Sequence, residues 1–130
     1  PISVGGYRTE TETASPFSGR GGQDCWGRVM LDIMAPAEAV RSAKAGGGYD
    51  VFTGTSMAAP FVSGSAALMM EWGIVQGNDP FLYGQRVKAF LCKGALRSPF
   101  LSYPNPLWGY GRLNLCGTMN ELVSHLERGL

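Results

Sequence analysis

The sequence predicts one domain of the α/β class, with a parallel sheet, a β-hairpin and a buried central helix. Three observations indicate this class. Residues 29–34 form a nearly continuous apolar run, which is typical of a strand covered on both faces in a parallel sheet. Strand-like segments flank the glycine triplet 46–48, which predicts a hairpin. Residues 57–75 carry a single charge, at Glu71, and predict a helix that is apolar on every side.

The length and charge limit the fold and the partners. The chain has 130 residues, enough for one modest hydrophobic core. Eleven Lys and Arg residues against ten Asp and Glu residues give a net charge of +1 without a basic run. We therefore expect neither nucleic acid nor a membrane as a partner. Glycine, at 19 residues, is roughly twice as frequent as usual and indicates turns and close backbone contacts.

The N-terminal half divides into short strands and a long polar segment. Residues 1–6 predict a strand that ends in a glycine turn, and residues 7–27 predict a surface loop. Pro36 ends the strand of the apolar run. Residues 39–43 and 49–53 are the expected strands of the hairpin.

The C-terminal half predicts two further helices around an irregular loop. Asp79 and Pro80 are a typical N-cap and first helical residue, and Gly94 is a typical stop. Residues 98–110, which contain three prolines, predict an ordered loop, and residues 118–128 predict the last helix. The inward side chains expected on these two helices are Tyr83, Val87, Phe90 and Leu91, then Leu122, Val123 and Leu126.

The helix over residues 57–75 is also nearly long enough to cross a membrane. Ser63, Gly64, Ser65 and Glu71 disfavour insertion, and Lys and Arg do not flank the segment. A buried helix of a water-soluble domain is the simpler interpretation. Three cysteines without CxxC spacing and one histidine predict no metal site, no cofactor and no disulfide framework, although a single bridge stays open.

Ser56 is the candidate nucleophile. A predicted strand ends at Thr53, Gly54 permits a tight turn, and Ser56 then stands at the first turn of the apolar helix. Free N–H groups and the positive end of the helix dipole favour an oxyanion at that position. From spacing alone, an ordinary helix N-cap is the favoured interpretation of Ser56.

Five segments together resemble the subtilisin-like serine proteases, the subtilase or peptidase S8 family. The segment GTSMAAP at residues 54–60 resembles the family's nucleophile segment. The other four are ISVGG at 2–6, FSGRG at 17–21, LDIMAP at 31–36 and GYGRLN at 109–114. Their order agrees with the family, and the resemblance covers about residues 1–116. It implies that residues 1–130 are the C-terminal part of a subtilisin-like catalytic domain.

A narrower similarity concerns the segments EWGIV and QGNDP at residues 71–80 and YPNP at residues 103–106. They resemble subtilases of clostridia and their relatives, which include the spore-germination proteases. This similarity favours a secreted or spore-associated bacterial protein over an intracellular one, and it does not establish a role in germination.

The resemblance assigns roles to residues around the serine. Ser56 would be the nucleophile of a peptidase, and its N–H one oxyanion donor that the Thr55 hydroxyl supports. The residues implied to line the substrate cleft are Phe52, Thr53 and Gly54 on the leaving-group side, with Met57 packed against Ser56. The implied substrate is a peptide or protein.

The rest of the machinery is missing from this sequence. Subtilases present their triad in the order Asp, His, Ser, and no histidine precedes Ser56. The acid, the base and the oxyanion Asn are expected in a missing N-terminal part of the same domain, which would be this chain's structural partner. We expect this chain alone to be inactive. Asp32 matches a position that joins a weak cation site in some members, but Met30 replaces a second carboxylate, so no calcium is expected.

Two other functions remain open from the sequence. A pseudoprotease would keep the fold as a binding or regulatory module without a working triad. An esterase resembling the α/β-hydrolases would use Ser56, Asp79 and His125 in that order, although Ala58 stands where the nucleophile elbow GxSxG has its last glycine.

Overall fold

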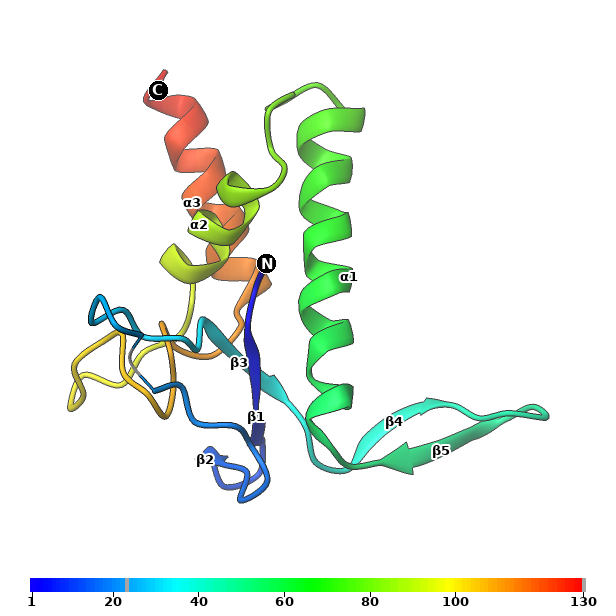
Figure 1. Ribbon diagram of the computed structural model, residues 1–130. Helices are drawn as coiled ribbons and strands as arrows, with labels where there is room; N and C mark the ends of the chain where they lie inside the picture. Colours follow the sequence, from blue (N-terminus) through cyan, green and yellow to red (C-terminus); the bar gives the residue numbers. More distant parts are fainter. Residues whose placement is uncertain (23, 130) are drawn as a thin grey trace.

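A small mixed sheet and three helices form the body of the protein, and a hairpin projects from it. The computed structural model describes residues 1–22 and 24–129. Figure 1 shows α1 along one side of strands β1 and β3, with α2 and α3 above them. The hairpin of β4 and β5 extends from the lower end of α1, away from the other elements. The α/β class with a parallel strand pair is confirmed.

The sheet has the order β2-β1-β3. β1 (Val4–Arg8) pairs in parallel with β3 (Ile33–Pro36), and β2 (Thr13–Ala14) pairs antiparallel with the end of β1. The predicted turn at Gly5 and Gly6 is wrong, because β1 continues through both glycines. A Cβ on Gly6 would lie 2.4 Å from the Cβ of Ala37, so glycine allows the two strands to approach.

β3 is shorter and later than the predicted strand. It begins at Ile33 because the preceding residue, Asp32, points its carboxylate back to the N–H of Ser3 at 2.8 Å. On its other edge, the Met34 N–H donates to the Gly111 carbonyl and the Leu113 N–H donates to the Met34 carbonyl. The segment GYGRLN therefore continues the sheet beyond β3.

The hairpin agrees with the prediction. β4 (Val40–Ala43) and β5 (Tyr49–Phe52) pair antiparallel, with Val40 opposite Phe52 and Ala43 opposite Tyr49. Gly46, Gly47 and Gly48 all have positive φ angles, which explains the three consecutive glycines at the tip.

The apolar helix comprises a 3₁₀ turn η1 (Thr55–Met57), the α-helix α1 (Ala59–Met70) and a π-helical turn η2 (Glu71–Val75). By length and composition alone this run is long enough to cross a membrane, a property that core helices of water-soluble proteins share. The expected burial holds for one face only. Val62, Ser65 and Met69 are buried, whereas Phe61 and Leu68 are 41% and 55% exposed.

The two remaining helices are α2 (Gln85–Lys93) and α3 (Leu115–Glu127). The predicted N-cap at Asp79 is wrong: its carboxylate accepts from the Phe81 N–H in a turn, and α2 begins after Gly84, whose φ is 56°. α3 begins before the predicted residue 118 because the Asn114 side chain accepts from the Gly117 N–H.

The predicted inward faces of α2 and α3 are partly wrong. Val87, Phe90, Leu91 and Leu122 are buried as expected. Tyr83 precedes α2 and is exposed, and Val123 and Leu126 are exposed on α3. α2 and α3 instead meet where Gly94 lies against Thr118, and a Cβ on Gly94 would be 2.4 Å from the Thr118 backbone.

Candidate active site

Ser56 lies in the connection between hairpin and helix, and hydrogen bonds to the segment after β3 fix that connection. The Thr53 hydroxyl accepts from the Ala39 N–H at 3.0 Å, and the Gly54 N–H donates to the Ala37 carbonyl at 2.8 Å. Gly54 has a φ of 153°, within the region that favours glycine. The chain then turns directly into η1, which contains Ser56 and precedes α1. Figure 1 shows the hairpin joined to this end of α1.

The Ser56 side chain is exposed, and its polar atoms are available. Among residues 1–22 and 24–129, neither its hydroxyl nor its N–H has a hydrogen-bond partner. The N–H belongs to the first turn of a helical run that continues to Val75. Such first-turn donors carry the positive end of the helix dipole. The position therefore combines a free hydroxyl with a backbone donor suited to an oxyanion.

Packing against the sheet holds this turn in place. A Cβ on Gly6 of β1 would lie 3.6 Å from the Thr55 γ-methyl group, so the Thr55 side chain directs its methyl to the strand. Ala58, at the junction between η1 and α1, is completely buried. The turn is thus anchored on both sides of Ser56.

The other residues that the resemblance assigns to the substrate cleft are neighbours of Ser56 in the chain. Phe52 is the last residue of β5 and is half-buried, and Thr53 is exposed. Met57 is the last residue of η1 and is half-buried. The backbone of Gly54 is close to the nucleophile, because a Cβ there would lie 3.4 Å from the Ser56 Oγ.

His125 does not belong to this site. Its ring contacts Phe90 edge-on with a centroid distance of 5.4 Å, and it lines a small cavity with Trp72 and Asp79. Trp72 follows Ser56 by sixteen residues of helix, so it lies roughly 24 Å along the axis. An esterase that uses Ser56 and His125 together is therefore incompatible with the structure.

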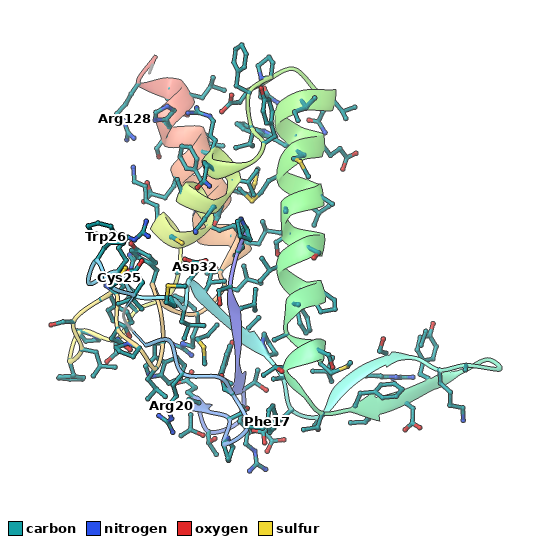
Figure 2. All side chains as sticks on the ribbon, in the orientation of Figure 1. Phe17, Arg20, Cys25, Trp26, Asp32 and Arg128 are labelled. Carbon is teal, nitrogen blue, oxygen red and sulfur yellow. The ribbon has the colours of Figure 1, made fainter. Side chains whose placement is uncertain are left out.

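Asp32 pairs with a side chain of the protein. It is 8% exposed, and its carboxylate lies 3.2 Å from the Lys88 ammonium, which also donates to the Pro1 carbonyl. Figure 2 shows Asp32 at the start of β3, below α2. In the part of the chain that the structure describes, no group of three or more His, Cys, Asp or Glu residues has a metal-binding arrangement.

The cysteines are all free thiols. Cys25 and Cys116 are exposed, whereas Cys92 is buried in α2. Burial raises the pKa of the Cys92 thiol to about 11, with a further contribution from the Asp32 carboxylate. A thiol with so high a pKa is a poor nucleophile near neutral pH.

Sequence analysis missed one cavity near Ser56. It has a volume of about 270 Å³ and lies between the β1–β2 turn and the base of the hairpin. Arg8, Glu10 and Glu38 supply its charges, and Thr53 forms part of its wall. The parallel register of β1 and β3, which places Tyr7 opposite Pro36, is the one signal that brings Arg8 and Glu38 together.

Two curated proteins illustrate the sequence similarity of this chain to known proteins. Subtilisin E of Bacillus subtilis strain 168 is 41% identical over 82 residues, which cover 60% of this chain and 19% of that protein. Subtilisin-like protease 7 of Trichophyton tonsurans is 39% identical over 74 residues, or 57% of this chain and 16% of that protein. The chain therefore spans about a fifth of the length of these curated relatives.

Solved structures show the same similarity over nearly the whole chain. The CspB protease of Clostridium perfringens is 49% identical with a TM-score of 0.89, covering 94% of this chain and 26% of that one. The patellamide maturation protease PatA is 31% identical with a TM-score of 0.72, covering 95% and 43%. The model of the subtilase family matches residues 1–111. This chain belongs to the subtilase family.

Proposed function

We propose that this chain is the C-terminal part of the catalytic domain of a serine endopeptidase, in which Ser56 is the nucleophile. The single observation that supports this most strongly is the position of Ser56. It is exposed, its hydroxyl and N–H are free among the described residues, and it begins the helix within a subtilase segment. The names of the relatives, which are proteases, support a peptide or protein as substrate.

The proposed reaction is hydrolysis through an acyl-enzyme. The Ser56 Oγ attacks the carbonyl carbon of the peptide bond, and its proton passes to a histidine base. The carbonyl oxygen becomes an oxyanion that accepts a hydrogen bond from the Ser56 N–H. The tetrahedral intermediate then collapses, the amine leaves with the proton from the histidine, and water hydrolyses the ester. In this proposal the Thr55 hydroxyl supports the oxyanion site, Met57 packs against Ser56, and Phe52, Thr53 and Gly54 line the leaving-group side.

The base, the acid and the oxyanion Asn must come from residues outside this sequence, because His125 is the only histidine and lies at the far end of the helix. Two surfaces suit such a structural partner. β2 pairs only with Tyr7 and Arg8, and Ser15 and Ser18 bond to Gly6, so within residues 1–22 and 24–129 the start of β1 before Gly6 has no paired strand on that side. The exposed side chains of Phe61 and Leu68 give α1 an apolar face.

A fluorophosphonate probe tests the proposal, because it forms a covalent adduct only with an activated serine. In the natural full-length protein we expect an adduct at Ser56, identified by mass spectrometry of the peptide. Ser56→Ala should abolish both the adduct and peptidase turnover. Ser63→Ala, a matched change at an exposed serine of α1, and His125→Ala should leave both unchanged. Loss of turnover in His125→Ala would contradict the proposal.

A pseudoprotease is the second candidate, because the one histidine of this sequence is far from Ser56. The same probe separates the two functions. A folded full-length protein that binds peptides but forms no adduct at Ser56 would indicate the binding module. We expect the isolated chain of 130 residues to be inactive in either case, and turnover by it that Ser56→Ala removes would contradict this expectation.

A further inference from the structure

The cavity near Ser56 is formed where three segments end together. β1 and β3 run in parallel, so their carboxyl ends reach the same edge of the sheet, an edge that commonly binds ligands in α/β folds. The end of β5 reaches the same place. The residues that line the cavity are Arg8 at the end of β1, Thr9 and Glu10 after it, Glu38 and Ala39 after β3, and Thr53 after β5.

The cavity wall and the nucleophile segment are one connected unit. The Thr53 hydroxyl accepts from the Ala39 N–H, and the next residue, Gly54, donates its N–H to the Ala37 carbonyl. The Ala37 N–H in turn donates to the Tyr7 carbonyl of β1. Hydrogen bonds therefore join the Thr53 and Ala39 wall of the cavity to the segment that carries Ser56.

The distance from this cavity to Ser56 is short. Thr53 precedes Ser56 by three residues, so at most about 10 Å separates them along the backbone. An extended peptide advances roughly 3.3 Å per residue. The family resemblance assigns Thr53 to the leaving-group side, so the second or third residue after the cleaved bond of a substrate at Ser56 would be within reach of the cavity.

The charges of the cavity favour a cation. Arg8 and Glu10 lie 3.6 Å apart and neutralise each other. Glu38 is half-buried, and it takes part in no ion pair within residues 1–22 and 24–129. The three charged side chains together therefore leave one negative charge, at Glu38, on a polar wall.

We propose that this cavity is a specificity pocket on the leaving-group side, which selects a lysine or arginine side chain at the second or third residue after the cleaved bond. The proposal rests on the proposed function, because it requires the substrate to bind across Ser56. Glu38 is the specificity-determining residue. Its carboxylate attracts the basic side chain, and the Thr53 and Ala39 wall positions that side chain.

Two sets of three peptide substrates test the proposal in the natural full-length protein. The peptides of one set differ only at the second residue after the cleaved bond, those of the other only at the third, and each set has Lys, Ala or Glu there. We expect kcat/KM to be about five-fold higher for Lys than for Ala, the size of a favourable exposed ion pair. Glu38→Gln should bring the Lys-to-Ala ratio close to one, and Glu38→Lys should favour the Glu peptide. High salt should reduce the preference of the unmodified protein.

Glu71→Gln is the matched control, because it removes the same charge from an exposed carboxylate at the far end of α1. We expect it to keep the preference for Lys. A preference that stays unchanged in both Glu38 variants, or no preference at all, would overturn the pocket while leaving the peptidase function intact.

Binding by the Ser56→Ala protein separates the failure of the pocket from the failure of the proposed function. Fluorescence anisotropy with labelled peptides that represent only the leaving-group side requires no turnover. The Lys peptide should bind several-fold more tightly than the Ala peptide, and Glu38→Lys should reverse the order. If the unsubstituted full-length protein hydrolyses no peptide while the Ser56→Ala protein shows this binding pattern, the peptidase proposal is wrong and the pocket is supported. Equal binding of all three peptides would overturn the pocket.

Discussion

The two faces of α1 differ in burial although they hardly differ in sequence. On the face that joins the hydrophobic core, Val62, Ser65 and Met69 are at most 7% exposed. On the other side, Phe61 and Leu68 are 41% and 55% exposed, and nothing lies within 4 Å of a Cβ placed on Gly64. Apolar residues that are uniformly distributed around a helix indicate burial on all sides. The bare face therefore marks a surface suited to a further packed element, and the following substitutions test that interpretation.

The largest effect is expected on the packed face. Met69 is completely buried, and Met69→Ala should lower the free energy of unfolding by about 2–5 kcal/mol through lost burial and a cavity. The neighbouring Leu68→Ala should change it by less than about 1 kcal/mol, because that side chain is largely exposed. Urea denaturation of the two variants measures the difference, and equal losses would show that the faces are equivalent.

Leu68→Asp distinguishes a bare face from a covered one. In the isolated chain we expect a change within about 0.5 kcal/mol, because the carboxylate stays in water. In the natural full-length protein, coverage by another part of the domain would bury that charge, and we expect a loss of about 2–4 kcal/mol. Parallel thermal melts with Leu68→Ala as the uncharged control check this. The same small change in both proteins would contradict the proposed partner surface.

Two glycines of the helical run provide a smaller contrast. A Cβ on Gly73 would lie 2.9 Å from the Leu82 side chain and from the Asp79 carbonyl, so Gly73→Ala should destabilise by about 1–3 kcal/mol. Gly64→Ala meets open space and should stabilise the isolated chain by up to about 1 kcal/mol, since alanine favours helix more than glycine. Chemical denaturation measures the change in the free energy of unfolding for each variant. Stabilisation by Gly73→Ala would disprove the close contact.

Cys92 on α2 extends the contrast to chemical reactivity, and near neutral pH, where the thiol is protonated in both states, its pKa shift has no effect on stability. Its pKa is raised to about 11 from 9.0, so the unfolded thiol loses its proton before the folded one does. The folded state binds more protons in this range, so its stability should fall as the pH rises from 9 to 11.

Iodoacetamide at pH 8.5, followed by peptide mass spectrometry, checks the difference directly. We expect rapid modification of the exposed Cys25 and Cys116 and slow modification of Cys92. Cys92→Ser should flatten the pH dependence of stability between 9 and 11. Modification of all three thiols at one rate in the folded protein would be evidence against the burial of Cys92.

Local patterns predicted the hairpin, the helical run and the α/β class from the sequence, because each depends on neighbouring residues. The glycine pair of β1 was mistaken for a turn, since only the contact with Ala37 explains it. Asp79 and Pro80 had the chemistry of a helix start, but the Asp79 carboxylate caps a turn and pairs with Arg86 at 2.7 Å instead. The burial of one face of α1 likewise depends on tertiary contacts.

The candidate site shows the same division. Ser56 and its flanking residues lie in one continuous segment, so a motif was sufficient to find them. Arg8 is the last residue of β1 and Glu38 follows β3, and the two meet only through the parallel register of these strands. As long as the strand pairing is unknown, the sequence contains no signal that places either residue near Ser56.

The hydrogen bonds that join β3 to Gly111 and Leu113 have a consequence for synthesis on the ribosome. Met34 emerges about 80 residues before its partner Arg112, which corresponds to roughly 4–16 s of translation. Throughout that interval one edge of β3 is open to other nascent chains. A chaperone that covers short apolar strands during translation should therefore raise the yield of correctly folded protein.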